Sequence, residues 1–155
     1  MRAVAFERVG AHGEPEVGYR AVIMLGNLLD VLAPNKVLEE QFRTGYRAAM
    51  CKRDKRKPPD DLYRVATCVK VLRNIAAVAF ATVGQLGAVC RVVFALSTPR
   101  ALDDDGWLFL VKPVLDGMTD AGCWTKDRRV IPYLAGHVDR EEWSSDVLDL
   151  SVHLL

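Results

Sequence analysis

Two aspartates separated by one residue, Asp103 and Asp105, are the side chains whose types and spacing point most directly to chemistry. In an extended chain this spacing places both carboxylates on the same side. Two like charges held together are costly unless something neutralises them, and a hard divalent cation does so well. The competing interpretation is a solvated acidic loop in which one aspartate caps the following helix.

Two further residues, Lys112 and Asp127, are expected near this pair. Asp103 and Asp105 follow an apolar strand and precede a predicted helix, so they belong at an end of the sheet. A helix over about 108–121 would return the chain toward the same edge, where Asp127 follows it. Three carboxylates from two loops would then converge, and the Lys112 amine on the helix could stabilise charge that develops on phosphoryl oxygens.

The segment that carries these residues resembles the RusA family of Holliday junction resolvases. The family pattern is D-x-D, then a helix of the form K-x-x-x-D-A-L, then A-G-x-W-x-D-D. The close match covers about 30 residues and consists of Asp103–Asp105, Lys112–Met118 and Ala121–Asp127. The resemblance implies that Asp103, Asp105 and Asp127 are metal ligands and that Lys112 is a catalytic residue.

The sequence departs from the family pattern at three points. Gly106 stands where the family has asparagine, and Lys126 replaces the first aspartate of the D-D pair. Lys112 lies seven residues after Asp105, which is further than in the best-known members. These departures affect one carboxylate of the proposed site and the placement of its lysine.

The resemblance implies a Mg²⁺-dependent endonuclease, with Mn²⁺ as a substitute metal, that resolves Holliday junctions by symmetric phosphodiester hydrolysis in DNA recombination and repair. It also implies a homodimer that acts on four-way or branched DNA and is common in phages and prophages. The alternative is a noncatalytic branched-DNA-binding protein on the same scaffold, which the departures at Gly106 and Lys126 motivate. A nuclease for branched or flap DNA in general is a third interpretation.

A basic run closed by two prolines, residues 51–59, is the second feature with a functional interpretation. Cations of this kind hold DNA phosphates and position the duplex without reading its sequence. The alternative for the basic run is a merely solvated loop. The alternative for Arg128 and Arg129 is ordinary charge on a surface strand. The candidate DNA-binding residues are Lys52, Arg53, Lys55, Arg56 and Lys57, together with Arg128 and Arg129, which follow Asp127.

The charge of the whole chain hides a strong asymmetry. The 155 residues have a formal net charge of +1, yet residues 1–100 hold 16 basic and 9 acidic groups. Residues 101–155 hold 5 basic and 11 acidic groups. Such asymmetry between halves suggests a polyanion partner or an ion site. With 50% hydrophobic residues, the composition excludes a disordered chain.

Several classes of protein are disfavoured by simple patterns. No stretch approaches about 18 consecutive apolar residues, so no membrane partner is expected. The first residues do not read as a signal peptide. The four cysteines are widely spread without a CxxC pair, which favours reduced thiols over a zinc site or disulfides. The expected location is the cytoplasm of a bacterium or of a phage-infected host cell.

The expected fold is a single α+β domain over 1–155, with a mixed sheet and two main helices on one face, in the order β-α-β-α-β-β. Residues 1–18 are expected to be irregular, 51–59 to form a basic loop, and 26–50 are ambiguous between helix and loop. Pro113 predicts that the second helix is regular only from about Lys112. The predicted strands are 19–25, 88–96, 128–134 and 147–155, and the predicted helices are 62–84 and 108–121.

Overall fold

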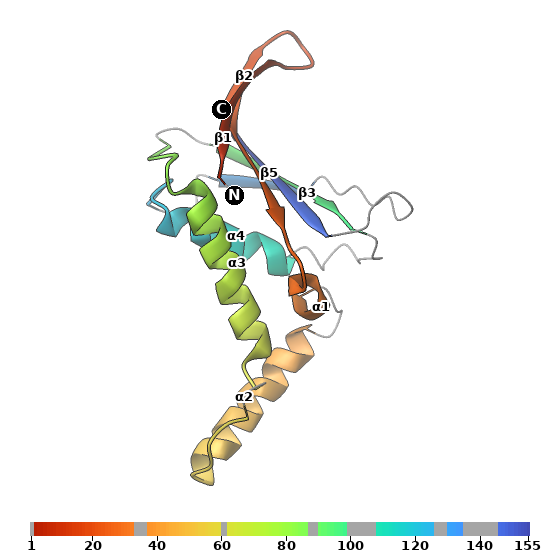
Figure 1. The fold of residues 1–155 in the computed structure, drawn as a ribbon, viewed down its shortest axis with the longest axis vertical. Helices are drawn as coiled ribbons and strands as arrows, with labels where there is room; N and C mark the ends of the chain where they lie inside the picture. The colour runs from red at the N-terminus through yellow and green to blue at the C-terminus, as the bar shows by residue number, and fades with distance from the viewer. Residues whose placement is uncertain are drawn as a thin grey trace.

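A computed structural model of the chain describes residues 2–32, 37–59, 62–86, 90–98, 108–125, 130–134 and 146–155. Along these residues two strands are followed by three helices, and a strand, a helix and two more strands complete an α+β arrangement (Figure 1). The elements are β1 (Val4–Val9), β2 (Pro15–Met24), α1 (Leu28–Leu32), α2 (Val37–Arg53), α3 (Arg64–Phe80), β3 (Cys90–Ser97), α4 (Leu108–Asp120), β4 (Val130–Leu134) and β5 (Val147–Leu154).

The strands form one mixed sheet in the order β1-β2-β5-β3-β4. The central strand β5 pairs antiparallel with both β2 and β3, and β1 pairs antiparallel with β2. Only the β3–β4 pair is parallel among these pairings, and α4 is the crossover helix between the two strands. The α+β class and the mixed sheet predicted from the sequence are confirmed.

One face of the sheet carries the hydrophobic core. Alternate residues of β3 are almost fully buried, whereas the residues between them are only half-buried. This period of two is typical of a strand with one covered face. Helices α3 and α4 cross on that face and contribute to the same cluster (Figure 1). Buried members from the three elements are Cys90, Val92, Phe94, Leu96, Leu72, Ala76, Ala79, Val114 and Met118.

Helices α3 and α4 pack closely against each other at Gly117. A Cβ atom placed there would lie 2.2 Å from the carbonyl oxygen of Arg73 and 2.8 Å from the Cβ of Ala76. No side chain fits at such distances without moving one helix. The glycine that follows Asp116 in the K-x-x-x-D-G segment therefore has a packing reason.

The prediction that residues 1–18 are irregular is wrong. They form β1 and the start of β2, which begins at Pro15 instead of Tyr19. The amide of Gly10 donates to the Glu14 carbonyl over 2.7 Å, and Gly13 adopts a positive φ of 82°. The glycines therefore form a tight hairpin turn between two strands. The Gly-rich composition of this segment had suggested a longer loop.

The ambiguous stretch 26–50 is helical over most of its described length, as α1 and α2. Helix α2 continues to Arg53, so the predicted basic loop 51–59 begins inside a helix and only its second part is loop. Helix α2 projects away from the sheet, and the segment after it runs back along it (Figure 1). None of the helices among the described residues has the length and hydropathy to cross a membrane.

Helix α4 begins at Leu108, as predicted, but it is helical through Pro113, whereas proline predicts a regular helix only from about Lys112. Proline removes one helical hydrogen bond and disfavours a helix interior. Leu110 and Val114 are fully buried on either side of it. Burial of this apolar turn therefore outweighs the preference of proline for a first turn.

Candidate functional site

The proposed metal ligands Asp103, Asp105 and Asp127 lie outside the described residues, as do Arg128 and Arg129. Their mutual distances remain predictions from the sequence. Among the residues that are described, no group of three His, Cys, Asp or Glu side chains is placed to hold a metal ion.

The elements that flank the segments with the three aspartates nevertheless limit how a shared metal site could form. These elements are β3, α4 and β4. Because β4 runs parallel to β3 and pairs Val130 with Cys90, it starts beside the first residue of β3. The helix therefore does not return the chain to the edge at which β3 ends, contrary to the expectation from its length. Helix α4 has 13 residues, which correspond to roughly 20 Å. A metal site that uses all three carboxylates must therefore span the distance between the two ends of α4, either within one chain or between two chains.

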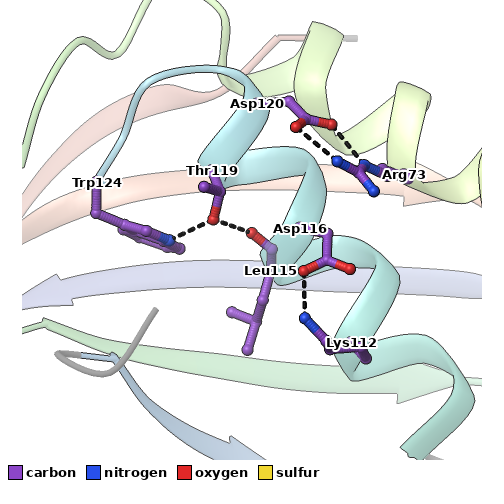
Figure 2. A network of polar contacts seen from close by, with 7 residues as sticks. All are labelled: Arg73, Lys112, Leu115, Asp116, Thr119, Asp120 and Trp124. Carbon is purple, nitrogen blue, oxygen red and sulfur yellow. Dashed lines mark hydrogen bonds and ion pairs between the residues drawn. The ribbon is translucent and has the colours of Figure 1, made fainter. Parts of the chain in front are cut away.

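Lys112 lies on an exposed part of α4 and forms an ion pair with Asp116, one helical turn later (Figure 2). The lysine side chain is 69% exposed and the aspartate side chain 29% exposed. An i,i+4 pair on a helix surface is worth only about 0.3–0.5 kcal/mol, so a stronger anion could take Lys112 from it. Lys112 and Asp116 are two residues of the matching helix, and the structure brings them together.

A second ion pair on α4 ties this helix to α3 (Figure 2). Arg73 donates to both carboxylate oxygens of Asp120, with distances of 2.5 and 2.8 Å. The hydrogen bond from Arg73 holds the pKa of the Asp120 carboxyl below its usual range. Asp120 is thus committed to a structural contact, and its charge is already neutralised by a neighbour.

The matching residues Gly122 and Trp124 lie at the C-terminal end of α4 and take part in its termination. The Cys123 amide donates to the Met118 carbonyl and the Gly122 amide to the Thr119 carbonyl, with Gly122 at a φ of 83°. This pattern is a Schellman motif, which favours glycine at that position. The Trp124 indole donates to the Thr119 hydroxyl over 2.8 Å and is nearly buried (Figure 2). This part of the resemblance therefore reflects helix termination.

The basic residues after α2 are held by a second Schellman motif. The Arg56 amide donates to the Cys51 carbonyl, and the Lys55 amide to the Lys52 carbonyl. Lys55 occupies the position that usually belongs to glycine, with a φ of 53°. The reversal makes the segment 56–59 run back along the helix.

An aspartate at this reversal orients two of the predicted phosphate-binding residues. The Asp54 carboxylate accepts hydrogen bonds from Arg53 at 3.1 Å and from Arg56 at 3.3 Å. Both arginines stay more than 60% exposed. Lys52, Lys55 and Lys57 are exposed as well, so the structure brings all five predicted cations of this run to one end of the molecule.

Sequence reasoning missed several residues that belong to the same surface. Arg43, Tyr46 and Arg47 are exposed on α2, and they precede the predicted run. Together, residues 43–57 hold seven basic side chains and a single acidic one, Asp54. The signal was available in the sequence, because one continuous helix carries Arg43 and Arg47 and leads directly into the basic run. It was missed because the sequence left residues 26–50 ambiguous between helix and loop.

A buried polar pair at the end of β3 was also missed. The Thr98 hydroxyl donates to the carboxylate of Asp146 over 2.5 Å, and the two residues are 0% and 6% exposed. The Asp146 carbonyl accepts from the Leu25 amide over 3.0 Å. The pair fixes the described residue that directly precedes 99–107. Forty-eight residues separate the partners, so no local pattern could have found them.

A scan against models of known protein families and a search of curated proteins both find no match to this chain. The likeness to the RusA family is therefore carried by the motif residues alone.

Proposed function

We propose that this chain is a Mg²⁺-dependent, structure-specific DNA endonuclease that resolves Holliday junctions by symmetric phosphodiester hydrolysis. The observation that carries the proposal is the basic projecting end of the molecule. Helix α2 extends away from the sheet (Figure 1), and residues 43–57 at its end hold seven basic side chains. A surface of this kind favours binding to the phosphate backbone of nucleic acid.

The proposed metal site supplies the hydrolytic chemistry. Asp103, Asp105 and Asp127 would hold Mg²⁺, because carboxylate oxygens are the ligands that this ion prefers. When bound, the ion lowers the pKa of a water and stabilises charge on the phosphate oxygens. The separation of the flanking ends of α4 is the geometric condition that this site must meet.

Lys112 has a defined task in this proposal. Its amine lies on the exposed side of α4 and is paired with Asp116. A phosphate oxygen carries more negative charge density in the transition state than in the ground state, so a cation at this position favours the reaction. Asp116 keeps the amine oriented when no DNA is bound. Cleavage of both strands requires two such sites, which a homodimer with two-fold symmetry provides.

A synthetic four-way junction tests the activity directly. We expect cleavage with Mg²⁺ or Mn²⁺ and none with a chelator. Asp103→Asn should abolish cleavage while leaving junction binding intact, because it removes one ligand and little else. Asp104→Asn is the matched control, because in an extended chain its carboxylate faces the other side, and it should retain cleavage.

Two outcomes would contradict the proposal in different ways. Junction binding without Mg²⁺-dependent cleavage would favour the noncatalytic branched-DNA-binding protein. Equal cleavage of junction, flap and linear duplex would show a nuclease without junction selectivity.

A further inference from the structure

A groove lies between α2 and the basic segment that runs back along it. Its volume is about 330 Å³, which is in the range of small-ligand sites. Both walls belong to the described residues, and the Schellman motif at Lys55 holds them together. The lining residues are Tyr46, Arg47, Met50, Cys51, Arg56 and Pro59, with Lys57 beside them.

Helical spacing explains why the floor of the groove is apolar. Tyr46 and Met50 are four residues apart on α2 and therefore share one side of the helix. Cys51 follows Met50 and is 7% exposed. Pro59 faces them from the returning segment. The floor thus combines a phenol ring with apolar side chains.

The aromatic ring in this groove is unusually open to solvent. Tyr46 is 65% exposed, although a tyrosine normally covers part of its ring in a core. Three cations line the same groove: Arg47 on the helix, and Arg56 and Lys57 on the returning segment. Asp54 fixes the guanidinium of Arg56 through a 3.3 Å contact.

We infer that this groove binds one unpaired nucleotide of a DNA strand, with the base stacked on Tyr46 and the adjoining phosphates on Arg47, Arg56 and Lys57. Exposed aromatic rings flanked by cations are the usual means by which proteins hold single-stranded nucleic acid. A fully paired duplex offers only phosphates to such a groove, whereas a strand with an unpaired base fills both its apolar and its charged parts. The choice of DNA over another nucleic acid rests on the proposed function.

The test compares single-stranded and duplex DNA of the same length, in a chelator so that no cleavage occurs. We expect Tyr46→Leu to weaken binding to the single strand by roughly 5- to 100-fold, the loss of one stacked base, and to change duplex binding little. Tyr46→Phe keeps the ring and should bind as the unaltered protein does. Tyr63→Leu is the matched control, because Tyr63 is also exposed, at 45%, but does not line the groove.

A fluorescent base analogue at an unpaired position reports stacking directly. We expect its emission to be quenched by the unaltered protein and by Tyr63→Leu, but not by Tyr46→Leu. The inference is overturned if Tyr46→Leu binds the single strand normally, if it weakens single-strand and duplex binding equally, or if Tyr46→Phe loses as much as Tyr46→Leu. If any of these results occurs while junction cleavage is normal, nucleotide binding in the groove is refuted but the proposed endonuclease activity is not. If binding depends on Tyr46 but no cleavage occurs, the endonuclease activity is refuted and nucleotide binding in the groove is not.

Discussion

His153 is a buried histidine whose protonation is influenced by several nearby charged side chains. It is 6% exposed, and its ring lies edge-on to Phe6 with centroids 5.3 Å apart. Within the described residues its Nδ1 atom has no hydrogen-bond partner, and the nearest carboxylate oxygen, on Glu16, is 3.8 Å away. Burial lowers the pKa of His153, with further lowering by Arg8 and Arg91 and an opposing effect of Glu16.

This lowered pKa predicts a pH-dependent stability. The unfolded chain binds the proton near the ordinary pKa of 6.5, whereas the folded chain binds it only at lower pH. The stability from neutral His153 is therefore complete above 6.5 and is lost as the pH falls from there toward the folded pKa. His153→Phe removes the titration and keeps a ring beside Phe6, so denaturant unfolding of this variant should lose that part of the pH dependence. Identical pH profiles for both proteins would contradict this.

Lys55 carries backbone strain at the end of α2. Its φ of 53° is a left-handed conformation that costs a non-glycine residue roughly 1 kcal/mol. Lys55→Gly and Lys55→Ala both remove the charge, but only glycine relieves the strain. We expect the glycine variant to be more stable than the alanine variant by about 1 kcal/mol in denaturant unfolding. Equal stabilities would show that Lys55 does not hold this conformation in solution.

At the scale of elements, the contact between α3 and α4 makes a sharp prediction. Gly117→Ala places a methyl group 2.2 Å from the Arg73 carbonyl oxygen, so the helices must separate. We expect a loss of about 1–3 kcal/mol in the free energy of unfolding. Gly45→Ala is the matched control on α2, where nothing lies within 4 Å of the added atom. It should gain about 0.5–1 kcal/mol from helix propensity alone. A neutral Gly117→Ala would contradict the close helix contact.

Elements with strong periodicity could be predicted from the sequence. The stripe along α3 and the alternation in β3 and β5 depend on one apolar face each, and all three elements lie within about two residues of the predicted bounds except at the C-terminal end of α3. Strand β1 could not be predicted in the same way, because most of its residues are exposed and its charges interrupt the apolar pattern. The helical turn before Pro113 depends on burial of Leu110, which overrides the local preference of proline for a first turn.

The same distinction between local patterns and long-range contacts applies to the candidate site. The basic run and Lys112 are local features, and the structure places them on exposed surfaces. The pairing of Thr98 with Asp146 and of Arg73 with Asp120 depends on contacts between distant segments, which no spacing in the sequence encodes. The convergence of three aspartates is a statement of this second kind, and for that reason spacing alone could not establish it.

The charge asymmetry along the chain has a counterpart in space at the end of α2. The front half carries an excess of basic groups, and much of that excess lies at the projecting end of α2 (Figure 1). The back half carries 11 acidic groups against 5 basic ones and would by itself repel DNA. A net charge of +1 thus conceals a concentrated basic surface at the end of α2 and an acidic excess in the second part of the sequence.

Under the proposed function, the basic surface at the end of α2 predicts where the salt dependence of DNA binding originates. Each phosphate neutralised by a cation adds about 0.9 to the slope of log affinity against log salt concentration for duplex DNA. Lys57→Gln should therefore lower that slope by roughly one and weaken binding to every sequence alike. Lys70→Gln removes a charge that is also exposed but lies on α3, outside residues 43–57, and should leave the slope unchanged. The measurement is fluorescence anisotropy of a labelled four-way junction, titrated at several salt concentrations without Mg²⁺. If both variants lower the slope equally, DNA does not bind specifically at the end of α2, and the charge asymmetry acts only through the net field of the molecule.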